Sequence, residues 1–202
     1  MNYYGRITMQ PLAVAQNRGA TAYREHLLMR KLFQHCAPVW HASTLGGLRR
    51  IVFVSGAKPE LPPDSPILVE IRPYPEEMLE ASRFGFEILL ANRQTRHLPG
   101  DAGNAERRYA FRSKDALLQW FPGFAAAQGG FEVKNPMLQK TGTVAFSRRN
   151  TVNDKYERIA FRTAEFAGEL KVIDRERFRS AVFNGLGKKK SYGCGLLRIF
   201  PI

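Results

Sequence analysis

The chain is organised around Asn184-Gly185-Leu186-Gly187-Lys188-Lys189-Lys190-Ser191-Tyr192-Gly193-Cys194-Gly195-Leu196-Leu197, in which four glycines surround three lysines and a serine near the C-terminus. Glycine lets successive backbone N–H groups face one concave side, and such concavities bind anions. Three lysines beside that surface would attract a polyanion. The stretch lacks the Lys-Ser/Thr spacing of a Walker loop and does not open a helix, so an NTPase is not predicted. On composition alone, a mobile and solvated basic loop is the alternative.

An apolar helical pattern leads into this glycine-rich stretch, and a short apolar run follows it. Asp174 is a candidate N-cap for a helix through Phe183, which carries Phe178, Ala181 and Val182 on one face. Gly185 is placed to end that helix. The run 196–200 is predicted to be a final strand.

The charge of the chain points to an anionic partner. The formal net charge is +13 and the isoelectric point is about 10.1. The excess is uneven, because residues 1–100 hold 12 Lys and Arg against 8 Asp and Glu, whereas residues 101–202 hold 19 against 10. Arginine outnumbers lysine, which suits bidentate phosphate contacts and stacking on bases. Nucleic acid or an anionic surface is therefore the indicated partner.

Several classes of protein are not predicted. There is no run of about 18 apolar residues, and the first residues do not read as a signal peptide, so no membrane span is expected. The two cysteines, Cys36 and Cys194, are far apart and form no Cys-x-x-Cys or Cys/His cluster. A reduced, cytoplasmic protein with no metal and no cofactor is therefore expected.

The element order of the first half predicts a ferredoxin-like unit. Strands are indicated at 6–9, 49–56, 67–72 and 84–91, a helix at 21–36 and a short helical segment at 75–80. The helix has Thr21 as its candidate cap, Glu25 in a favourable place near its N-terminus and a buried stripe. The stripe comprises Leu28, Met29, Leu32, Phe33 and Cys36. The order β-α-β-β-(α)-β is that of a ferredoxin-like unit.

The second half is predicted to repeat this plan. Its expected elements are a helix at 114–121 capped by Ser113, strands at 131–133, 143–146, 159–166 and 168–173, a basic β-hairpin at 147–158, and the C-terminal helix, loop and strand already described. We therefore expect an α+β protein of two tandem ferredoxin-like (RRM-like) domains with a C-terminal glycine-rich loop. The expected boundaries are 1–93 for the first domain, 94–110 for a linker and 111–202 for the second domain.

The first predicted helix carries the candidate chemistry. At 100° per residue, Tyr23, His26 and Arg30 fall within about 60° of one another on one face. Lys31 lies about 140° round from His26, so its long side chain must lean to share a site. Histidine can act as an acid or a base near neutral pH. The alternatives are a surface histidine, a tyrosine that packs in the core and a solvated lysine.

Taken together, the glycine-rich loop, the Tyr23-x-x-His26 helix and the helix that opens with Asp174-Arg175-Glu176 resemble the CasE-type CRISPR repeat endoribonucleases of the RAMP superfamily. In that family the C-terminal loop reads roughly Gly-Ile-Gly-x-x-Lys-Ser/Ala-x-Gly-x-Gly-Leu-Leu. The matching positions here are Gly185, Gly187, Lys190, Ser191, Gly193, Gly195, Leu196 and Leu197. Lys188 and Lys189 depart from the pattern, because family members often have smaller or neutral residues there.

The resemblance implies metal-independent cleavage of CRISPR precursor RNA at the base of the repeat stem-loop. The 2′-OH of the RNA would attack, leaving 5′-hydroxyl and 2′,3′-cyclic phosphate ends. His26, Tyr23 and Lys31 would be the catalytic residues, and the sequence leaves open whether Tyr23 or His26 takes the first proton. His35, His41 and His97 are expected to have no catalytic role, and Trp40 and Trp120 are expected in the core.

The expected partners are the CRISPR repeat RNA hairpin and the other subunits of a crRNA-guided effector complex. A-form RNA has a deep major groove that only inserted basic side chains reach. The candidate RNA-binding residues are Arg30, Arg148, Arg149, Lys155, Arg158, Gly187, Lys188, Lys189, Lys190 and Ser191. Two alternatives stay open: a non-catalytic RAMP subunit that binds crRNA without cutting it, and a general RNA-binding module.

Overall fold

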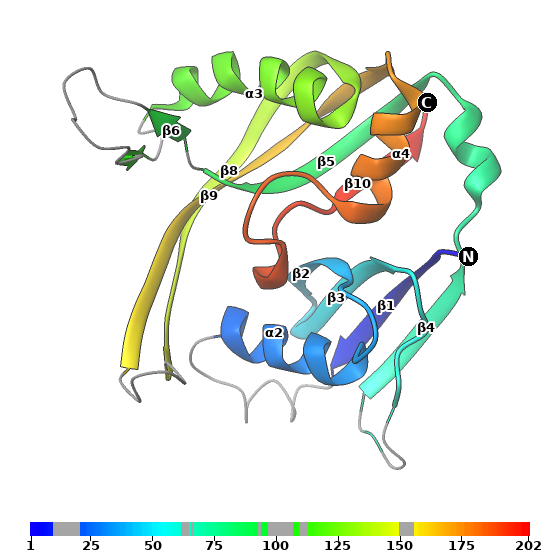
Figure 1. The fold of residues 1–202 in the computed structure, drawn as a ribbon, viewed down its shortest axis with the longest axis vertical. Coiled ribbons are helices and arrows are strands. Elements are labelled where there is room, and N and C mark those ends of the chain that lie inside the picture. Colours follow the sequence, from blue (N-terminus) through cyan, green and yellow to red (C-terminus); the bar gives the residue numbers. More distant parts are fainter. Residues whose placement is uncertain are drawn as a thin grey trace.

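The computed structural model describes residues 1–9, 21–61, 65, 67–92, 94–96, 107–109, 113–149 and 156–202. Two four-stranded antiparallel sheets account for most of this part of the chain. The glycine-rich loop lies between the N-terminal sheet and the C-terminal sheet (Figure 1).

The first sheet has one helix on it. Its elements are β1 (Tyr3–Met9), α2 (Thr21–Leu32), β2 (Val39–Leu45), β3 (Leu48–Ser55) and β4 (Ile67–Pro73), in the strand order β2-β3-β1-β4. The predicted stripe of α2 is confirmed, because Met29, Leu32 and Phe33 are buried and Leu28 and Cys36 pack beside them. They cover Ile7 and Phe53 of the sheet.

The second sheet is a complete β-α-β-β-α-β unit. Its elements are β5 (Arg83–Ala91), α3 (Lys114–Gly129), β8 (Phe131–Arg149), β9 (Tyr156–Val172), α4 (Arg175–Asn184) and β10 (Leu197–Pro201), in the order β10-β5-β9-β8. Both helices lie on the same face (Figure 1), where Phe121 of α3 and Phe178 of α4 share one core with Phe86 and Phe166. The predicted α+β class and the two ferredoxin-like sheets are confirmed.

The assignment of residues 84–91 to the N-terminal unit is wrong. This segment is β5, which pairs with β9 and β10. The fourth strand of the first sheet is β2, which the sequence analysis missed; a turn through Gly46 and Gly47, both with positive φ, joins it to β3. We propose that the boundary between the domains lies between Pro73 and Arg83, around the short helix η1 (Glu76–Glu80).

Other boundaries also differ from expectation. The helix predicted at 114–121 runs to Gly129 through Pro122, because the burial of Phe121 and Ala125 outweighs the hydrogen bond that proline removes. Conversely, α2 ends at Leu32 instead of residue 36. The segment predicted as a linker contains two paired strands, β6 (Gln94–Arg96) and β7 (Arg107–Tyr109).

Three predicted caps are confirmed. The side chains of Ser113 and Asp174 accept hydrogen bonds from backbone N–H groups of the first turns of α3 and α4. Gly185 ends α4 with a φ of +68°, in the left-handed region that glycine favours. The side chain of Thr21 lies outside the described part of the structure.

The basic hairpin is the outer end of a much longer one. β8 and β9 pair from Phe131–Val172 to Arg149–Tyr156, and their outer end passes beyond the sheet beside α2 (Figure 1). The prediction of a hairpin at 147–158 is confirmed. Lys155 lies outside the described residues.

Candidate active site

The glycine-rich loop is folded against the N-terminal domain. The Leu186 amide donates to the Gly195 carbonyl over 2.9 Å, and the Gly195 amide donates to the Leu89 carbonyl over 2.7 Å. Gly193 lies against the ring of Trp40: its φ is +82°, and an added Cβ would come within 2.8 Å of that ring. The alternative of a mobile, solvated loop is therefore wrong, since the loop is a fixed part of the interface between the domains.

A groove of about 730 Å³ is lined by α2, by the segment that follows it as far as Trp40, and by Ser191 of the loop. Four of its lining residues were predicted as site residues, namely His26, Arg30 and Lys31 of α2 and Ser191 of the loop. Lys31 thus lines the same groove as His26 despite the angle between them on the helix. The groove holds a histidine that can exchange protons and two cations that can stabilise negative charge.

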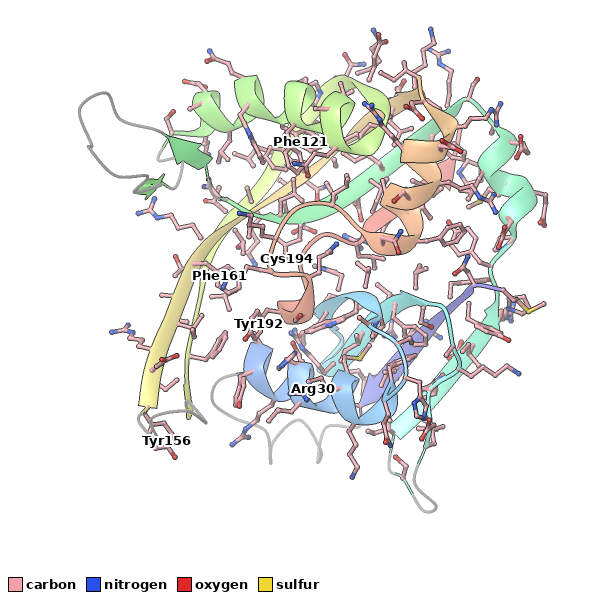
Figure 2. All side chains as sticks on the ribbon, in the orientation of Figure 1. Arg30, Phe121, Tyr156, Phe161, Tyr192 and Cys194 are labelled. Atoms are coloured by element: carbon pink, nitrogen blue, oxygen red, sulfur yellow. The ribbon has the colours of Figure 1, made fainter. Side chains whose placement is uncertain are left out.

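Tyr192 of the loop lies directly beside His26. Their ring centroids are 5.0 Å apart, and Tyr192 is part of the short helix η2 (Lys190–Tyr192). Figure 2 shows Tyr192 at the point where the loop meets α2, the helix that carries Arg30. Tyr192 was not among the site residues predicted from the sequence. The available signal was an aromatic residue inside a stretch of glycine and lysine.

Tyr23 occupies a different position from His26. Its ring stacks on Phe146 of β8, with centroids 5.5 Å apart and ring planes 13° apart. It is half-buried in a cluster with Phe161, Cys194 and Tyr192, and it is not among the residues that line the groove. The centroids of the Tyr23 and His26 rings are 6.1 Å apart. Tyr23 therefore tethers α2 to the hairpin while it stays next to His26.

A buried ion pair fixes α2 on the first sheet. Glu25, next to His26 in the sequence, is 6% exposed, and its carboxylate lies 2.5 Å from Nε of Arg49 on β3. Arg49 also donates to the hydroxyl of Thr44. From the sequence, Glu25 was expected to lie near the N-terminus of the helix, and its pairing with Arg49 was not predicted. The helical turn that carries His26 is therefore held on two sides. Glu25 binds Arg49 of the first sheet, and Tyr23 stacks on Phe146 of the hairpin.

The lysines of the loop have three different environments. Lys188 is exposed. Nζ of Lys189 lies over the rings of Phe161 and Tyr192, at 5.4 and 5.7 Å from their centroids. Nζ of Lys190 donates to the Asn184 carbonyl over 2.9 Å and so ties the loop to the end of α4.

The loop does not offer all of its amides to a ligand. The amides of Tyr192 and Cys194 donate to the Lys189 carbonyl, and that of Gly193 donates to the Lys190 carbonyl. The expected concave anion site is thus wrong for this half of the loop. In the other half of the loop, Gly187 has a φ of +72°, a backbone conformation that glycine adopts readily.

The basic residues of the hairpin are only partly described. Arg158 is exposed on β9, opposite Ser147 of β8. The backbones of Arg148 and Arg149 belong to β8, but their side chains, like Lys155, lie outside the described part of the structure.

Burial perturbs two ionisable side chains near the loop, His41 and Cys194. Burial, aided by the nearby charge of Arg198, lowers the pKa of His41 to about 4, so it stays neutral. His35 is exposed beside Glu60, and His97 lies outside the described residues. Burial raises the pKa of the Cys194 thiol to about 12, so it packs as an apolar residue.

The described residues contain neither a candidate metal site nor a candidate membrane-spanning helix. No group of three or more His, Cys, Asp or Glu side chains there could hold a metal ion. Among the helices described here, none is long and apolar enough to cross a membrane.

Comparisons with known proteins agree on one fold. The model of a family described as CRISPR associated protein matches residues 2–201. A CRISPR endoribonuclease Cse3 bound to 19-nucleotide RNA aligns with a TM-score of 0.76 and 18% identity, covering 99% of both chains. Cas6e from Escherichia coli K-12 aligns at 0.65 and 16%, covering 100% of both. A chain of a CRISPR RNA-guided surveillance complex aligns at 0.68 and 20%, covering 99% of this chain and 100% of that one. No curated protein sequence gives a significant match.

Proposed function

The chain belongs to the family of CRISPR-associated proteins, and from this premise we propose that it is an endoribonuclease that cuts CRISPR precursor RNA at the base of the repeat stem-loop. One observation carries the proposal. His26, Arg30 and Lys31 of α2 line the same groove as Ser191 of the glycine-rich loop. A proton-exchanging group and cations in one groove meet the needs of RNA cleavage by its own 2′-OH.

In the proposed reaction the 2′-oxygen attacks the adjacent phosphorus and the bond from phosphorus to the 5′-oxygen breaks. One group removes the 2′-OH proton, and a second proton goes to the departing 5′-oxygen. The products are a 2′,3′-cyclic phosphate and a 5′-hydroxyl, with no change of oxidation state and no metal required. His26 serves this proton transfer, and Lys31 and Arg30 stabilise the charge on the phosphorane.

The role of Tyr23 follows from its packing. Its ring stacks on Phe146 of the hairpin and lies next to the ring of His26, but it does not line the groove. We therefore propose His26 as the main proton carrier, with Tyr23 holding the 2′-oxygen or sharing the transfer.

The proposed RNA grip uses the hairpin and the loop. The outer end of β8 and β9 stands beside α2, and there Arg148, Arg149, Lys155 and Arg158 would enter the major groove of the stem. Two of the loop lysines, Lys188 and Lys189, would meet phosphates, whereas Lys190 holds the loop itself. Binding product with the same contacts as substrate gives slow release, so we propose that the chain keeps the crRNA as one subunit of a surveillance complex.

The decisive experiment incubates the protein with its cognate repeat RNA in EDTA. The expected result is cleavage at one position at the base of the stem, with a cyclic phosphate on the upstream product. An unrelated hairpin should stay intact. Binding of the repeat hairpin without cleavage would identify a non-catalytic subunit, and equal binding of both hairpins would identify a general RNA-binding module.

Replacing both loop lysines tests the proposed phosphate contacts. The Lys188→Ala/Lys189→Ala protein should bind repeat RNA more weakly, and the slope of log affinity against log salt should fall by about 0.7–0.9 for each lost contact. Cleavage at saturating protein should change little. Lys171→Ala, which removes an exposed lysine at the opposite end of β9, should leave the slope unchanged. An unaltered slope in the double variant would remove these lysines from the interface.

A further inference from the structure

The first sheet has a second face, opposite α2, over which the described residues place no helix. Alternate residues of its strands share this face: Tyr4 lies opposite Arg72 and Val54, and Arg6 lies opposite Glu70 and Val52. In the second sheet two helices cover one face, whereas the described residues between β3 and β4 contain no helix. Leu196 of the glycine-rich loop packs on Val54 at one end of this face, whereas Glu70 and Arg72 are exposed, so the rest of the face is available to a partner.

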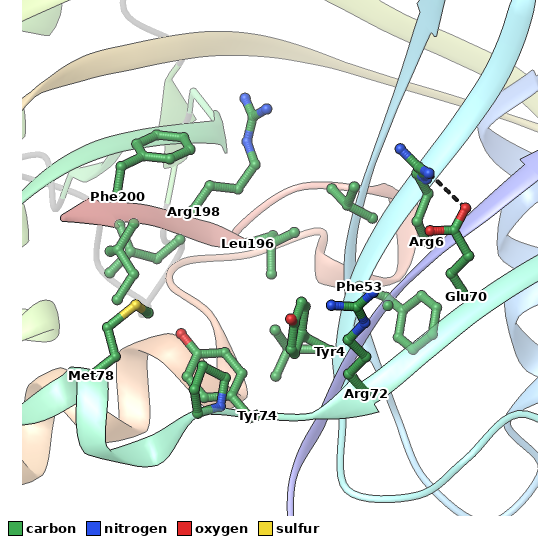
Figure 3. A pocket seen from close by; sticks show the side chains of 16 residues that line it. Tyr4, Arg6, Phe53, Glu70, Arg72, Tyr74, Met78, Leu196, Arg198 and Phe200 are labelled. Carbon is green, nitrogen blue, oxygen red and sulfur yellow. Dashed lines mark hydrogen bonds and ion pairs between the residues drawn. The ribbon is translucent and has the colours of Figure 1, made fainter.

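This face borders a groove of about 520 Å³ between the first sheet and β10 (Figure 3). Its walls combine apolar and cationic side chains. The apolar ones include Val52, Val54 and Leu196, and the cationic ones are Arg6, Arg72 and Arg198. A pocket of this size with an apolar floor and guanidinium groups at its rim fits a planar, apolar group joined to an anion.

The charge at the rim is predominantly positive. Three arginines, Arg6, Arg50 and Arg72, act on a single carboxylate, Glu70, and together they hold its pKa below its usual range, the hydrogen bond from Arg6 contributing most. Arg6 contacts Glu70 over 2.6 Å. The ratio of three guanidinium groups to one carboxylate leaves a surplus that attracts anions.

Several arginine nitrogens on this side have no protein partner. Among the described residues, the buried side-chain nitrogens without a hydrogen bond are Nε of Arg6, Arg50 and Arg198 and Nδ1 of His41. Arg198 already meets Glu87 and Glu165. Arg6 and Arg198 line the groove, and Arg50 shares the sheet face with Arg6. Because these Nε atoms are buried, a ligand in the groove would meet the outer guanidinium nitrogens of Arg6 and Arg198 and not Nε.

An aromatic side chain is held at the edge of the same groove. Tyr4 is 38% exposed, and its ring meets that of Tyr74 edge-on, with centroids 5.9 Å apart. Tyr74 in turn packs against Phe183 of α4. The exposed ring of Tyr4 is thus supported from behind and can serve as a platform for a base.

We propose that this groove binds a single-stranded segment of RNA next to the hairpin, with a base against Tyr4 and phosphates on Arg6, Arg50 and Arg72. The proposal rests on the proposed function. Exposed aromatic rings beside arginines on an open sheet are the means by which proteins hold single-stranded RNA. The positive surplus favours a polyanion over a protein segment.

The glycine-rich loop connects this groove with the candidate active site. Ser191 lines the groove that holds His26, whereas Leu196 lines the groove on the open sheet face. Five residues of extended chain span at most about 18 Å. A strand of a few nucleotides leaving the cut site can therefore follow the loop from one groove to the other.

The test measures binding of repeat RNA that carries a deoxynucleotide at the cut site, so that it stays intact. The hairpin is compared alone, with eight unpaired nucleotides on its 5′ side and with eight on its 3′ side. One flank should tighten binding to the wild-type protein. Tyr4→Ala and Arg72→Ala should each weaken binding of that flanked RNA about tenfold and leave binding of the bare hairpin unchanged. Arg83→Ala, an exposed arginine outside the groove, is the matched control.

Each other outcome overturns the proposal. The proposal is wrong if neither flank tightens binding, or if the variants weaken binding of the bare and flanked RNAs equally. It is also wrong if the variants bind RNA as the wild type does but lose a partner protein, which would make the groove a protein site. Cleavage of an all-ribose repeat RNA that carries both flanks is measured in parallel with the wild-type protein. Loss of the flank effect with cleavage intact rejects this groove alone, whereas absence of cleavage rejects the proposed function.

Discussion

His26→Ala should reduce the rate of repeat RNA cleavage by about 10²–10⁴ and leave RNA affinity within about twofold of wild type. The ring lines the groove with Arg30 and Lys31, and a histidine side chain can both accept and donate a proton near neutral pH. Single-turnover cleavage at saturating protein separates this loss from any change in affinity.

Two matched variants sharpen the test of His26. His35→Ala removes an exposed histidine beside Glu60 and should cleave at the wild-type rate. Tyr23→Phe keeps the stack on Phe146 but removes the hydroxyl, so a slower rate would assign that hydroxyl a part in the reaction. If His26→Ala cuts as fast as wild type, the chain is not a nuclease of the proposed kind.

The local parts of the fold were predictable from the sequence because their causes are local. The apolar period of α2 fixed its buried stripe, and the side chains of Ser113 and Asp174 capped their helices as expected. Gly185 ended α4 because the left-handed backbone there suits glycine. These features depend on residues within one or two turns of each other.

The pairing of strands was less predictable because partners are distant in the chain. β5 alternates buried and less buried residues, a pattern that suits an inner strand of either sheet. Its partners, β9 and β10, begin more than 60 residues later in the sequence. The missed strand β2 has a buried first half, which includes His41, and an exposed second half, so its alternation is weak.

The same limit applies to the candidate site. The helix phase grouped His26 with Arg30, but it could not show that Tyr192 of the loop would lie beside His26 or that Glu25 would pair with Arg49. The loop adds Ser191 to a groove that is otherwise lined by α2 and the segment after it. The approach of the loop depends on Gly193, since any side chain there would meet the ring of Trp40.

A single deoxynucleotide at the cut site of the repeat RNA should abolish cleavage, with no product detectable at saturating protein. The 2′-oxygen is the proposed nucleophile, and no side chain is proposed to replace it. Because one hydroxyl is removed from a hairpin otherwise gripped through its backbone and stem, binding should remain close to that of the all-ribose RNA.

The matched control for this substrate carries the deoxynucleotide at a different position. A deoxynucleotide one residue away from the cut site removes a hydroxyl but not the nucleophile, so that RNA should be cut at the usual bond. Cleavage of the substrate modified at the cut site would mean that water, activated by the protein, attacks the phosphorus instead. The upstream product would then end in a 3′-phosphate, because a deoxyribose has no 2′-oxygen with which to form the cyclic phosphate. The mass of the product would identify this end. In that case His26 could still move a proton, but the groove lined by α2 and Ser191 would have to position a water molecule as well as the phosphate.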